Sequence, residues 1–203
     1  AKKLKRILID SGYYVPSRSL IPGFIDSILA GQVDSSSTPG TNFVSDKQVY
    51  LYVDKMIRFY LNEKPILQQP KSVTLTAENI PSIFESLGDW VIKRFDGRGG
   101  KVVWVGSKLK EKEVADLRRL VEQSPQVFKA QERLQISRLD QDIVDLRPFS
   151  YVGSEHLILA GVPWGRGAPV NGDGKMNISG NGHEVTVLIG ERLHAADCEK
   201  LLK

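Results

Sequence analysis

The sequence has one cysteine and no long apolar run. The single cysteine, Cys198, excludes an internal disulfide framework and is typical of proteins from a reducing compartment, so we expect the cytoplasm. No stretch approaches the roughly 18 consecutive apolar residues that a transmembrane helix needs. The basic N-terminal cluster is followed by only Ile7, Leu8 and Ile9 before Asp10, which is too short for the core of a signal peptide.

The histidines do not indicate a zinc site, and the charge pattern does not indicate a nucleic-acid-binding surface. His156, His183 and His194 show no metal-type pairing, and no Gly-x-Ser-x-Gly nucleophile motif is present. The 28 basic residues exceed the 24 acidic ones by four, but bases alternate with acids, as in 108–113. Such alternation is typical of a solvated helix face rather than of a surface that follows a nucleic-acid backbone. We therefore expect no nucleic-acid partner and no membrane partner.

The composition predicts an ordinary globular protein with helices and strands. Charged residues make up 26% of the 203 residues and hydrophobic residues 41%, which suffices for a buried core. A helix is predicted after Ser45 and a second one over 76–87, with Gly88 as its C-cap. We expect core packing from the apolar positions that repeat at helical spacing in the first of these helices, Val49, Val53, Met56, Ile57, Tyr60 and Leu61.

The most informative stretch is 90–100, an apolar run interrupted by Lys93 and closed by glycines. A strand over 90–95 would fix the direction of Lys93, and Gly97, Gly99 and Gly100 would let the backbone approach an anion closely. Residues 102–105 are predicted to form the returning strand of a hairpin. The pattern is neither a Walker loop nor the dinucleotide fingerprint. Taken alone, it is equally consistent with an ordinary hairpin that exposes one lysine.

The following elements are of types that phosphate chemistry uses. An amphipathic helix is predicted over 111–122, ended by Ser124 and Pro125, and a strand over 127–134 carries Gln131 and Glu132. These two side chains are suited to an adenine edge and a ribose hydroxyl. Arg147 precedes Pro148 at the start of an apolar strand, where a guanidinium suits a bidentate phosphate contact.

A third group lies beside small, flexible residues near the end of the chain. Arg166 and Asn177 adjoin glycine-rich segments, and Asn177 is suited to a metal or to a phosphate oxygen. Gly180 and Gly182 would permit another close approach of the backbone. Each of these residues, taken singly, is as well explained by a surface ion pair or a turn. Their order along the chain favours a common site.

The whole series resembles the circularly permuted branch of the ATP-grasp superfamily, related to glutathionylspermidine synthase-type domains. The resemblance covers roughly residues 10–188, most of the chain. It is carried by spaced motifs, which are more specific together than any one alone. Before the lysine strand these are 19–23, 30–33, 38–41, 46–47 and 60–67; from it onward they are 91–100, 130–131, 145–149, Arg166 and 177–182.

The resemblance implies an α+β fold with nucleotide held between two lobes, one of residues 44–131 and one of 132–203 together with 1–43. It implies an ATP- and Mg²⁺-dependent ligase that joins a small-molecule or peptide carboxylate to an amine or thiol through an acyl phosphate. Lys93 and a closing loop over 96–100 would hold the phosphates, and Gln131 and Glu132 would lie beside the adenine. Lys47 would approach the nucleotide from the first lobe. Arg147 and Arg166 would hold the transferred phosphoryl group.

Three departures from the family pattern keep another function open. Ser37 begins a turn where the family has asparagine, Ser45 replaces an aspartate before Asp46, and 182–185 lacks the usual Ser-Lys-Asp. The metal ligands are therefore not identified, although Asp10, Asp34 and Glu184 remain nearby. A domain that binds nucleotide or a partner without turnover is the alternative, and a phosphotransferase is a third option. We also expect this chain to be the C-terminal part of a longer protein.

Overall fold

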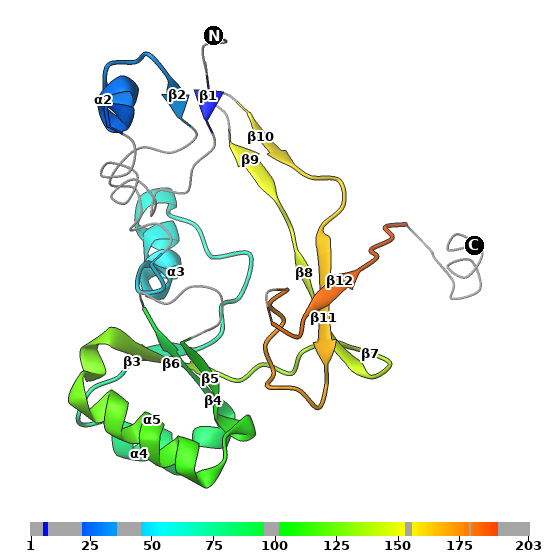
Figure 1. Ribbon diagram of the computed structural model, residues 1–203. Helices are drawn as coiled ribbons and strands as arrows, with labels where there is room; N and C mark the ends of the chain where they lie inside the picture. The colour runs from blue at the N-terminus through cyan, green and yellow to red at the C-terminus, as the bar shows by residue number, and fades with distance from the viewer. Residues whose placement is uncertain are drawn as a thin grey trace. The chain divides into compact units, whose positions relative to one another are not determined.

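The computed structural model describes residues 6–7, 22–35, 46–95, 102–152, 156–178 and 180–190 (Figure 1). The chain forms two compact units, residues 1–69 and 70–203. The predicted glycine loop with Gly97, Gly99 and Gly100 lies outside the described residues. The two predicted lobes, with boundaries near residues 43 and 131, stay a prediction.

The first unit contains short elements only. The two-residue strands β1 (Arg6–Ile7) and β2 (Asp34–Ser35) pair in parallel, and α2 (Phe24–Leu29) precedes β2. A continuous helical stretch follows as a 3₁₀ turn, η3 (Val49–Tyr52), one α-turn, α3 (Val53–Met56), and a π-helical turn, η4 (Ile57–Leu61). The helix predicted in this region is thus present but irregular.

The core role predicted for the apolar face of that helix is wrong for the structure of this unit. None of the residues of η3, α3 and η4 is buried, and Tyr60 is 75% exposed. Among the described residues of the unit, Ile25 is the only buried hydrophobic residue, so these residues provide no buried layer for the helix to pack on. Helical periodicity predicted the conformation but not the burial.

The second unit begins with a four-stranded antiparallel sheet in the order β3-β6-β4-β5, covered on one face by two helices. Leu75, Ile92, Val121 and Phe128 are almost completely buried between the sheet and these helices. The elements are β3 (Ser72–Thr74), α4 (Ile80–Glu85), β4 (Trp90–Arg94), β5 (Val103–Val105), α5 (Glu111–Gln123) and β6 (Phe128–Glu132).

The lysine hairpin is confirmed, because β4 and β5 pair antiparallel with Lys93 opposite Val103. The helix over 111–122 is confirmed as α5, whose first turn is fixed by Glu113: its Oε2 accepts the Lys110 N–H at 2.8 Å. The strand after it is shorter than predicted, since β6 ends at Glu132.

The helix predicted over 76–87 is shorter, and its predicted glycine cap is absent. Residues 77–79 form a turn in which Asn79 Oδ1 accepts the Thr76 N–H at 2.9 Å, so α4 begins only at Ile80. Beyond α4 the chain tightens into a 3₁₀ turn, η5 (Leu87–Asp89), that includes Gly88. Gly88 does not adopt the positive φ of a left-handed C-cap.

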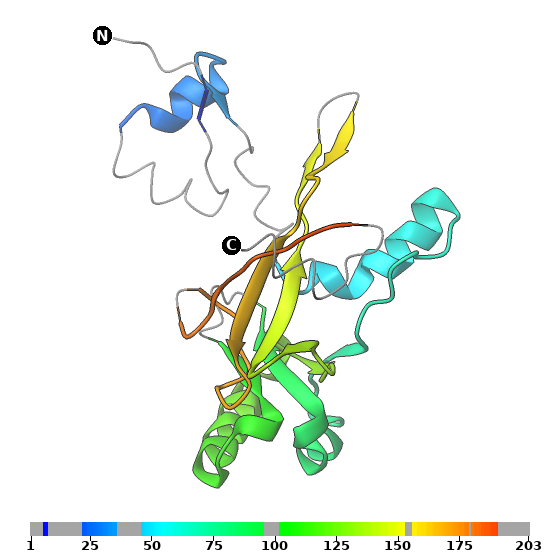
Figure 2. The ribbon, with the colours of Figure 1, turned by 90° about the vertical axis from the view of Figure 1, so that its right-hand side faces the viewer.

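The second sheet of this unit is antiparallel in the order β12-β11-β8-β7 (Figure 2). Its strands are β7 (Arg138–Leu139), β8 (Asp142–Arg147), β11 (Trp164–Pro169) and β12 (His183–Val185). A hairpin of β9 (Ser150–Val152) and β10 (Leu157–Leu159) follows β8. Arg147 is the last residue of β8, where Pro148 has no N–H to continue the ladder, and the apolar strand predicted after it is present as β9. None of the described helices is long and apolar enough to cross a membrane.

Candidate functional site

Lys93 lies on the face of the first sheet that the helices leave uncovered. Side chains alternate along β4, so the fully buried Ile92 faces the helices and Lys93 faces away from them. Lys93 Nζ donates a hydrogen bond of 2.8 Å to Gln131 Oε1 on β6. Two of the predicted site residues are therefore in direct contact, although 38 positions separate them in the sequence.

Lys129 completes this cluster, and the sequence analysis missed it. It is the cross-strand partner of Lys93, so the two side chains share one face of the sheet. Lys129 is only 2% exposed. Their side chains therefore place two positive charges close together. The alternation of β6, with buried Phe128 and Ala130 on the helix side, is the signal that would have found it.

Gln131 and Glu132 were predicted to act together, but they are neighbours on β6, so their side chains lie on opposite faces of the sheet. Glu132 pairs with Trp90 at the end of the ladder, whereas Gln131 lies opposite Val91. The Glu132 carboxylate accepts the Lys71 backbone N–H at 2.8 Å, and its own N–H donates to the Lys71 carbonyl oxygen at 2.8 Å. Glu132 thereby fixes the entry of the chain into β3.

Arg147 and Arg166 come together on one face of the second sheet. Arg166 lies directly opposite Asp145, and Arg147 lies two residues further along the same face of β8. The Arg166 guanidinium binds Asp145 through two bonds: Nε to Oδ1 at 2.8 Å and Nη2 to Oδ2 at 2.5 Å. Both side chains are largely buried, with exposed fractions of 20% and 29%.

The glycines that flank Arg166 have a packing role on the opposite face of the sheet. A Cβ on Gly165 would lie 2.4 Å from the Val185 carbonyl oxygen, and one on Gly167 would lie 2.8 Å from His183 Nε2. Glycine is needed at Gly165 because the backbone of the paired strand β12 lies so close, whereas the atoms near Gly167 belong to side chains that can shift. Because side chains alternate along β11, Arg166 lies on the opposite face from these glycine positions, the face that it shares with Arg147.

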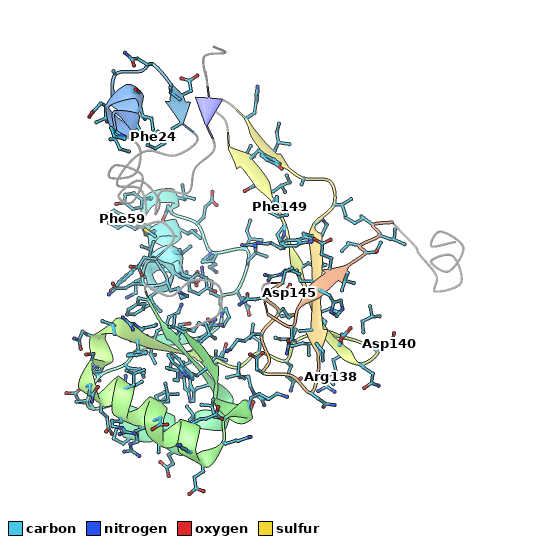
Figure 3. All side chains as sticks on the ribbon, in the orientation of Figure 1. Phe24, Phe59, Arg138, Asp140, Asp145 and Phe149 are labelled. Atoms are coloured by element: carbon cyan, nitrogen blue, oxygen red, sulfur yellow. The ribbon has the colours of Figure 1, made fainter. Side chains whose placement is uncertain are left out.

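Asn177 and Lys47 are the remaining predicted site residues among those that the structure describes, and Figure 3 draws the side chains of the described residues. Asn177 precedes β12, and its carbonyl oxygen accepts the N–H groups of Gly180 and Gly182 at 2.9 and 3.1 Å. A Cβ on Gly182 would lie 2.7 Å from that same oxygen, so the turn requires glycine. Lys47 is half-buried in a turn of the first unit. The described residues contain no group of three or more His, Cys, Asp or Glu side chains able to hold a metal ion.

Two pKa shifts occur outside these clusters. Burial raises the pKa of Tyr50 above its ordinary value of 10.0, and the charge of Asp54 adds to the effect. A hydrogen bond from the Thr76 side chain lowers the pKa of the Glu78 carboxyl, helped by a backbone hydrogen bond. Neither group is one of the predicted site residues.

A comparison with known proteins identifies the family. Residues 11–162 match the family model described as circularly permuted ATP-grasp type 2. The chain belongs to the circularly permuted ATP-grasp family. This confirms the predicted family and its α+β fold class.

The relatives are longer proteins. A protein of Frankia alni named "Putative glutamate--cysteine ligase 2-3" is 32% identical over 147 residues, 68% of this chain and 17% of its own length. An uncharacterized protein of Mycobacterium bovis is 30% identical over 187 residues, 87% of this chain and 34% of its own length. The chain thus spans between a sixth and about a third of the length of these relatives.

Among solved structures, D-alanyl-alanine synthetase A from Vibrio cholerae is similar with a TM-score of 0.48 and 15% sequence identity. The match covers 90% of this chain and 54% of that chain.

Proposed function

We propose that this chain forms the nucleotide-binding part of an ATP-dependent ligase that joins a carboxylate to an amine or thiol. In the proposed reaction, a carboxylate oxygen attacks the γ-phosphorus of ATP and ADP leaves. The amine or thiol then attacks the acyl carbon and phosphate leaves. Family membership and the cation clusters support this reaction class, and the substrates would be small molecules or peptides. The single cysteine supports the cytoplasm as the compartment.

The observation that carries the proposal is the contact between Lys93 and Gln131 on the face of the first sheet that the helices leave uncovered. Lys93 and Lys129 lie side by side there, and Gln131 binds Lys93 Nζ through its side-chain oxygen. The ammonium group of Lys93 suits the polyanionic phosphates of ATP, and the almost completely buried Lys129 adds positive charge beside it. The side-chain amide of Gln131 retains donors and suits an adenine edge or a ribose oxygen. These residues therefore fit a nucleotide.

The remaining roles follow from charge. Lys93 would bind the phosphates, and Arg147 and Arg166 would neutralise charge on the transferred phosphoryl group. Asn177 offers oxygen and nitrogen to a phosphate or a metal ion, and Lys47 and the loop with Gly97, Gly99 and Gly100 would complete the enclosure. Magnesium would neutralise phosphate charge and fix phosphate geometry when bound. The chain itself would supply position and charge.

A second candidate function is supported by the bond between Arg166 and Asp145. An arginine that already binds a carboxylate through two hydrogen bonds is less available to a phosphoryl group. Together with the sequence departures at Ser37 and Ser45, this favours a domain that binds nucleotide without turnover. Release of ADP that depends on added carboxylate and amine supports the ligase; nucleotide binding without any ADP release supports the second candidate.

The direct test is calorimetric titration of magnesium ATP into the wild-type chain, Lys93→Met and Lys112→Met. Lys112 is an exposed lysine on α5 and serves as the matched control. Loss of a charge-assisted contact worth about 1.5–3 kcal/mol predicts roughly 10- to 100-fold weaker binding in Lys93→Met. Equal affinity in all three proteins would show that the phosphates do not bind at Lys93, and the proposal would then be wrong.

A further inference from the structure

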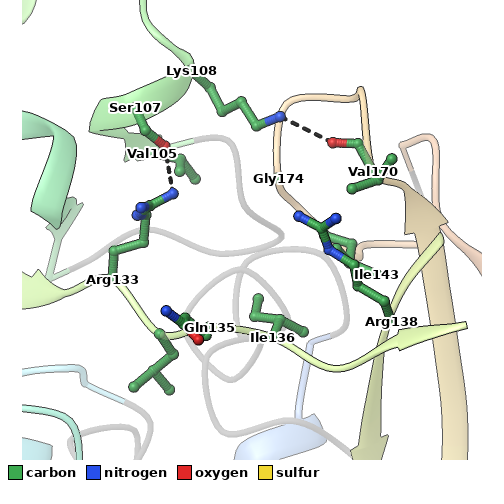
Figure 4. Close-up of a pocket in the computed structure, with 11 residues that line it drawn as sticks. Val105, Ser107, Lys108, Arg133, Gln135, Ile136, Arg138, Ile143, Val170 and Gly174 are labelled. Carbon is green, nitrogen blue, oxygen red and sulfur yellow. Dashed lines mark hydrogen bonds between the residues drawn. The ribbon is translucent and has the colours of Figure 1, made fainter. Parts of the chain in front are cut away.

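A cavity of about 520 Å³ lies beside the segment that follows β6 (Figure 4). The charged side chains in its wall are those of Lys108, Arg133 and Arg138. Val105 in its wall lies on the same sheet face as Lys93. Ile143 in its wall lies on the same face as Arg166, so the cavity continues the surfaces that the proposed function assigns to ATP. Arg147, at the far end of β8, is not part of this wall, and a site for the second substrate of a ligase is to be sought there.

The Arg147 guanidinium is available to a ligand. The side chain is exposed, and no hydrogen bond or ion pair joins it to another of the residues that the structure describes. Arg166 differs, because its guanidinium already binds Asp145 through two hydrogen bonds. Of the two arginines assigned to the transferred phosphoryl group, Arg147 is therefore the one whose donors can bind the carboxylate of an incoming substrate.

Two aromatic side chains flank this guanidinium. Trp164 lies directly opposite Arg147 on β11, so the two side chains share one face of the sheet. Phe149 lies beyond the end of β8, on the way to β9, and alternation places it on the same face as Arg147 (Figure 3). Its carbonyl oxygen accepts the Ala160 N–H at 2.9 Å, which fixes the backbone at this point. Trp164 is half-buried and Phe149 is 41% exposed, so both rings offer surface to a ligand.

The chain beside these rings carries no charge. Residues 148–152 and 157–164 include no acidic and no basic side chain. Tyr151 and Ile158 lie opposite each other on β9 and β10, and they are 65% and 61% exposed. A charged group of a ligand placed here would lose water and find no partner, which is costly. An apolar group would gain by leaving water, so the surface beside Arg147 favours a ligand whose only charge is its carboxylate.

We propose that the carboxylate substrate carries an uncharged aromatic or branched apolar group, which lies against Trp164 and Phe149 while Arg147 binds the carboxylate. The inference rests on the proposed ligase function and names the substrate class of that site. Guanidinium donors bind carboxylate oxygens in pairs, which orients the acid toward the transferred phosphoryl group. An aromatic group packs on the two rings beyond the gain from leaving water alone. The carboxylate belongs either to a small acid or to the C-terminus of a peptide.

The test uses the tryptophan Nε1–H signals in ¹H–¹⁵N NMR spectra of the whole chain, with and without magnesium and β,γ-methylene-ATP. The chain has three tryptophans, and the signal missing in Trp164→Phe is that of Trp164. We expect a saturable shift of this signal on titration with 3-phenylpropionate. The neutral 3-phenylpropionamide and the doubly acidic L-glutamate should give no saturable shift at the same concentrations. A shift that does not saturate, or equal affinity for L-glutamate, overturns the proposal.

Variants assign the two parts of the ligand. Arg147→Gln should weaken binding of 3-phenylpropionate roughly 10- to 100-fold, as expected for loss of a charge-assisted contact. Trp164→Gln should weaken it about ten-fold, whereas Trp164→Phe, which keeps an aromatic ring, should stay within about three-fold of wild type. The exposed control Arg119→Gln should bind like wild type. Equal affinity in all variants overturns the proposal, and Arg147→Gln keeps the test decisive if Trp164→Gln does not fold.

The calorimetric titration of magnesium ATP reports on the proposed function separately. ATP binding that depends on Lys93, together with an unshifted Trp164 signal, overturns this inference and leaves the ligase proposal standing. A saturable shift at Trp164 without any ATP binding overturns the ligase proposal, and with it the role of the acid as a substrate. N-acetyl-L-phenylalanine identifies the source of the carboxylate: affinity about ten-fold above that of 3-phenylpropionate indicates a peptide C-terminus, and equal or lower affinity indicates a small acid.

Discussion

The bond between Arg166 and Asp145 should contribute measurably to the stability of the second unit. The guanidinium and the carboxylate form two hydrogen bonds of 2.8 and 2.5 Å, with side chains only 20% and 29% exposed. Hydrogen bonds to charged groups contribute about 1.5–3 kcal/mol each in favourable sites, but both partners regain water on unfolding. We expect a coupling energy of about 2 kcal/mol for the pair.

The assay is a double-mutant cycle of Arg166→Gln and Asp145→Asn, with the free energy of unfolding measured by urea titration. The cycle removes the effects that each substitution has on its own. A second cycle on Arg118 and Glu122 provides the control within the same unit. That pair has a similar N–O distance of 2.9 Å, but its side chains are 48% and 50% exposed, so we expect about 0.3–0.5 kcal/mol.

Salt gives an independent check of the same reasoning. Screening acts strongly on exposed charges and weakly on buried ones, so high salt should abolish the coupling of the control pair and leave most of the coupling between Arg166 and Asp145. A coupling energy for Arg166 and Asp145 below about 0.5 kcal/mol would refute the argument, because the pair would then behave like an exposed one.

Three further predictions concern the frame around the site. Gly106→Ala should lower the free energy of unfolding in urea by about 1–3 kcal/mol, because the new Cβ would lie 1.9 Å from the Leu87 carbonyl oxygen. The control Gly88→Ala, whose Cβ would have no atom within 4 Å, should leave the free energy of unfolding nearly unchanged. Equal losses of stability in the two variants would contradict this reasoning. Glu132→Gln should change the calorimetric affinity for ATP less than two-fold, because its carboxylate already binds a backbone N–H; a larger loss would place it at the nucleotide. Because its pKa is lowered in the folded state, ionised Glu78 stabilises the fold at pH values above its ordinary pKa of 4.5. The free energy of unfolding of the wild-type chain should therefore exceed that of Glu78→Gln at neutral pH, and the difference should disappear as the pH falls through the folded-state pKa. A difference that persists in acid would exclude this cause.

Local patterns in the sequence sufficed for the hairpin and for the family. The apolar run with one lysine fixed β4, and the amphipathic pattern fixed α5, since period and end signals act within a few residues. The spaced motifs identified the circularly permuted ATP-grasp family, which the family match confirms. The contact between Lys93 and Gln131 agrees with the prediction that both serve one site. Their roles toward a nucleotide stay predictions.

The tertiary structure decided what each polar side chain faces. Side chains alternate between the two faces of a strand. Only the helices packed on the sheet determine that Glu132 lies on the helix-covered face and Lys129 on the face without helices. Strand register placed Asp145 opposite Arg166, and no local signal in either strand specified that partner. The cavity with Lys108, Arg133 and Arg138 exists because three distant segments meet. Such convergence depends on long-range packing, which the sequence encodes only through the fold as a whole.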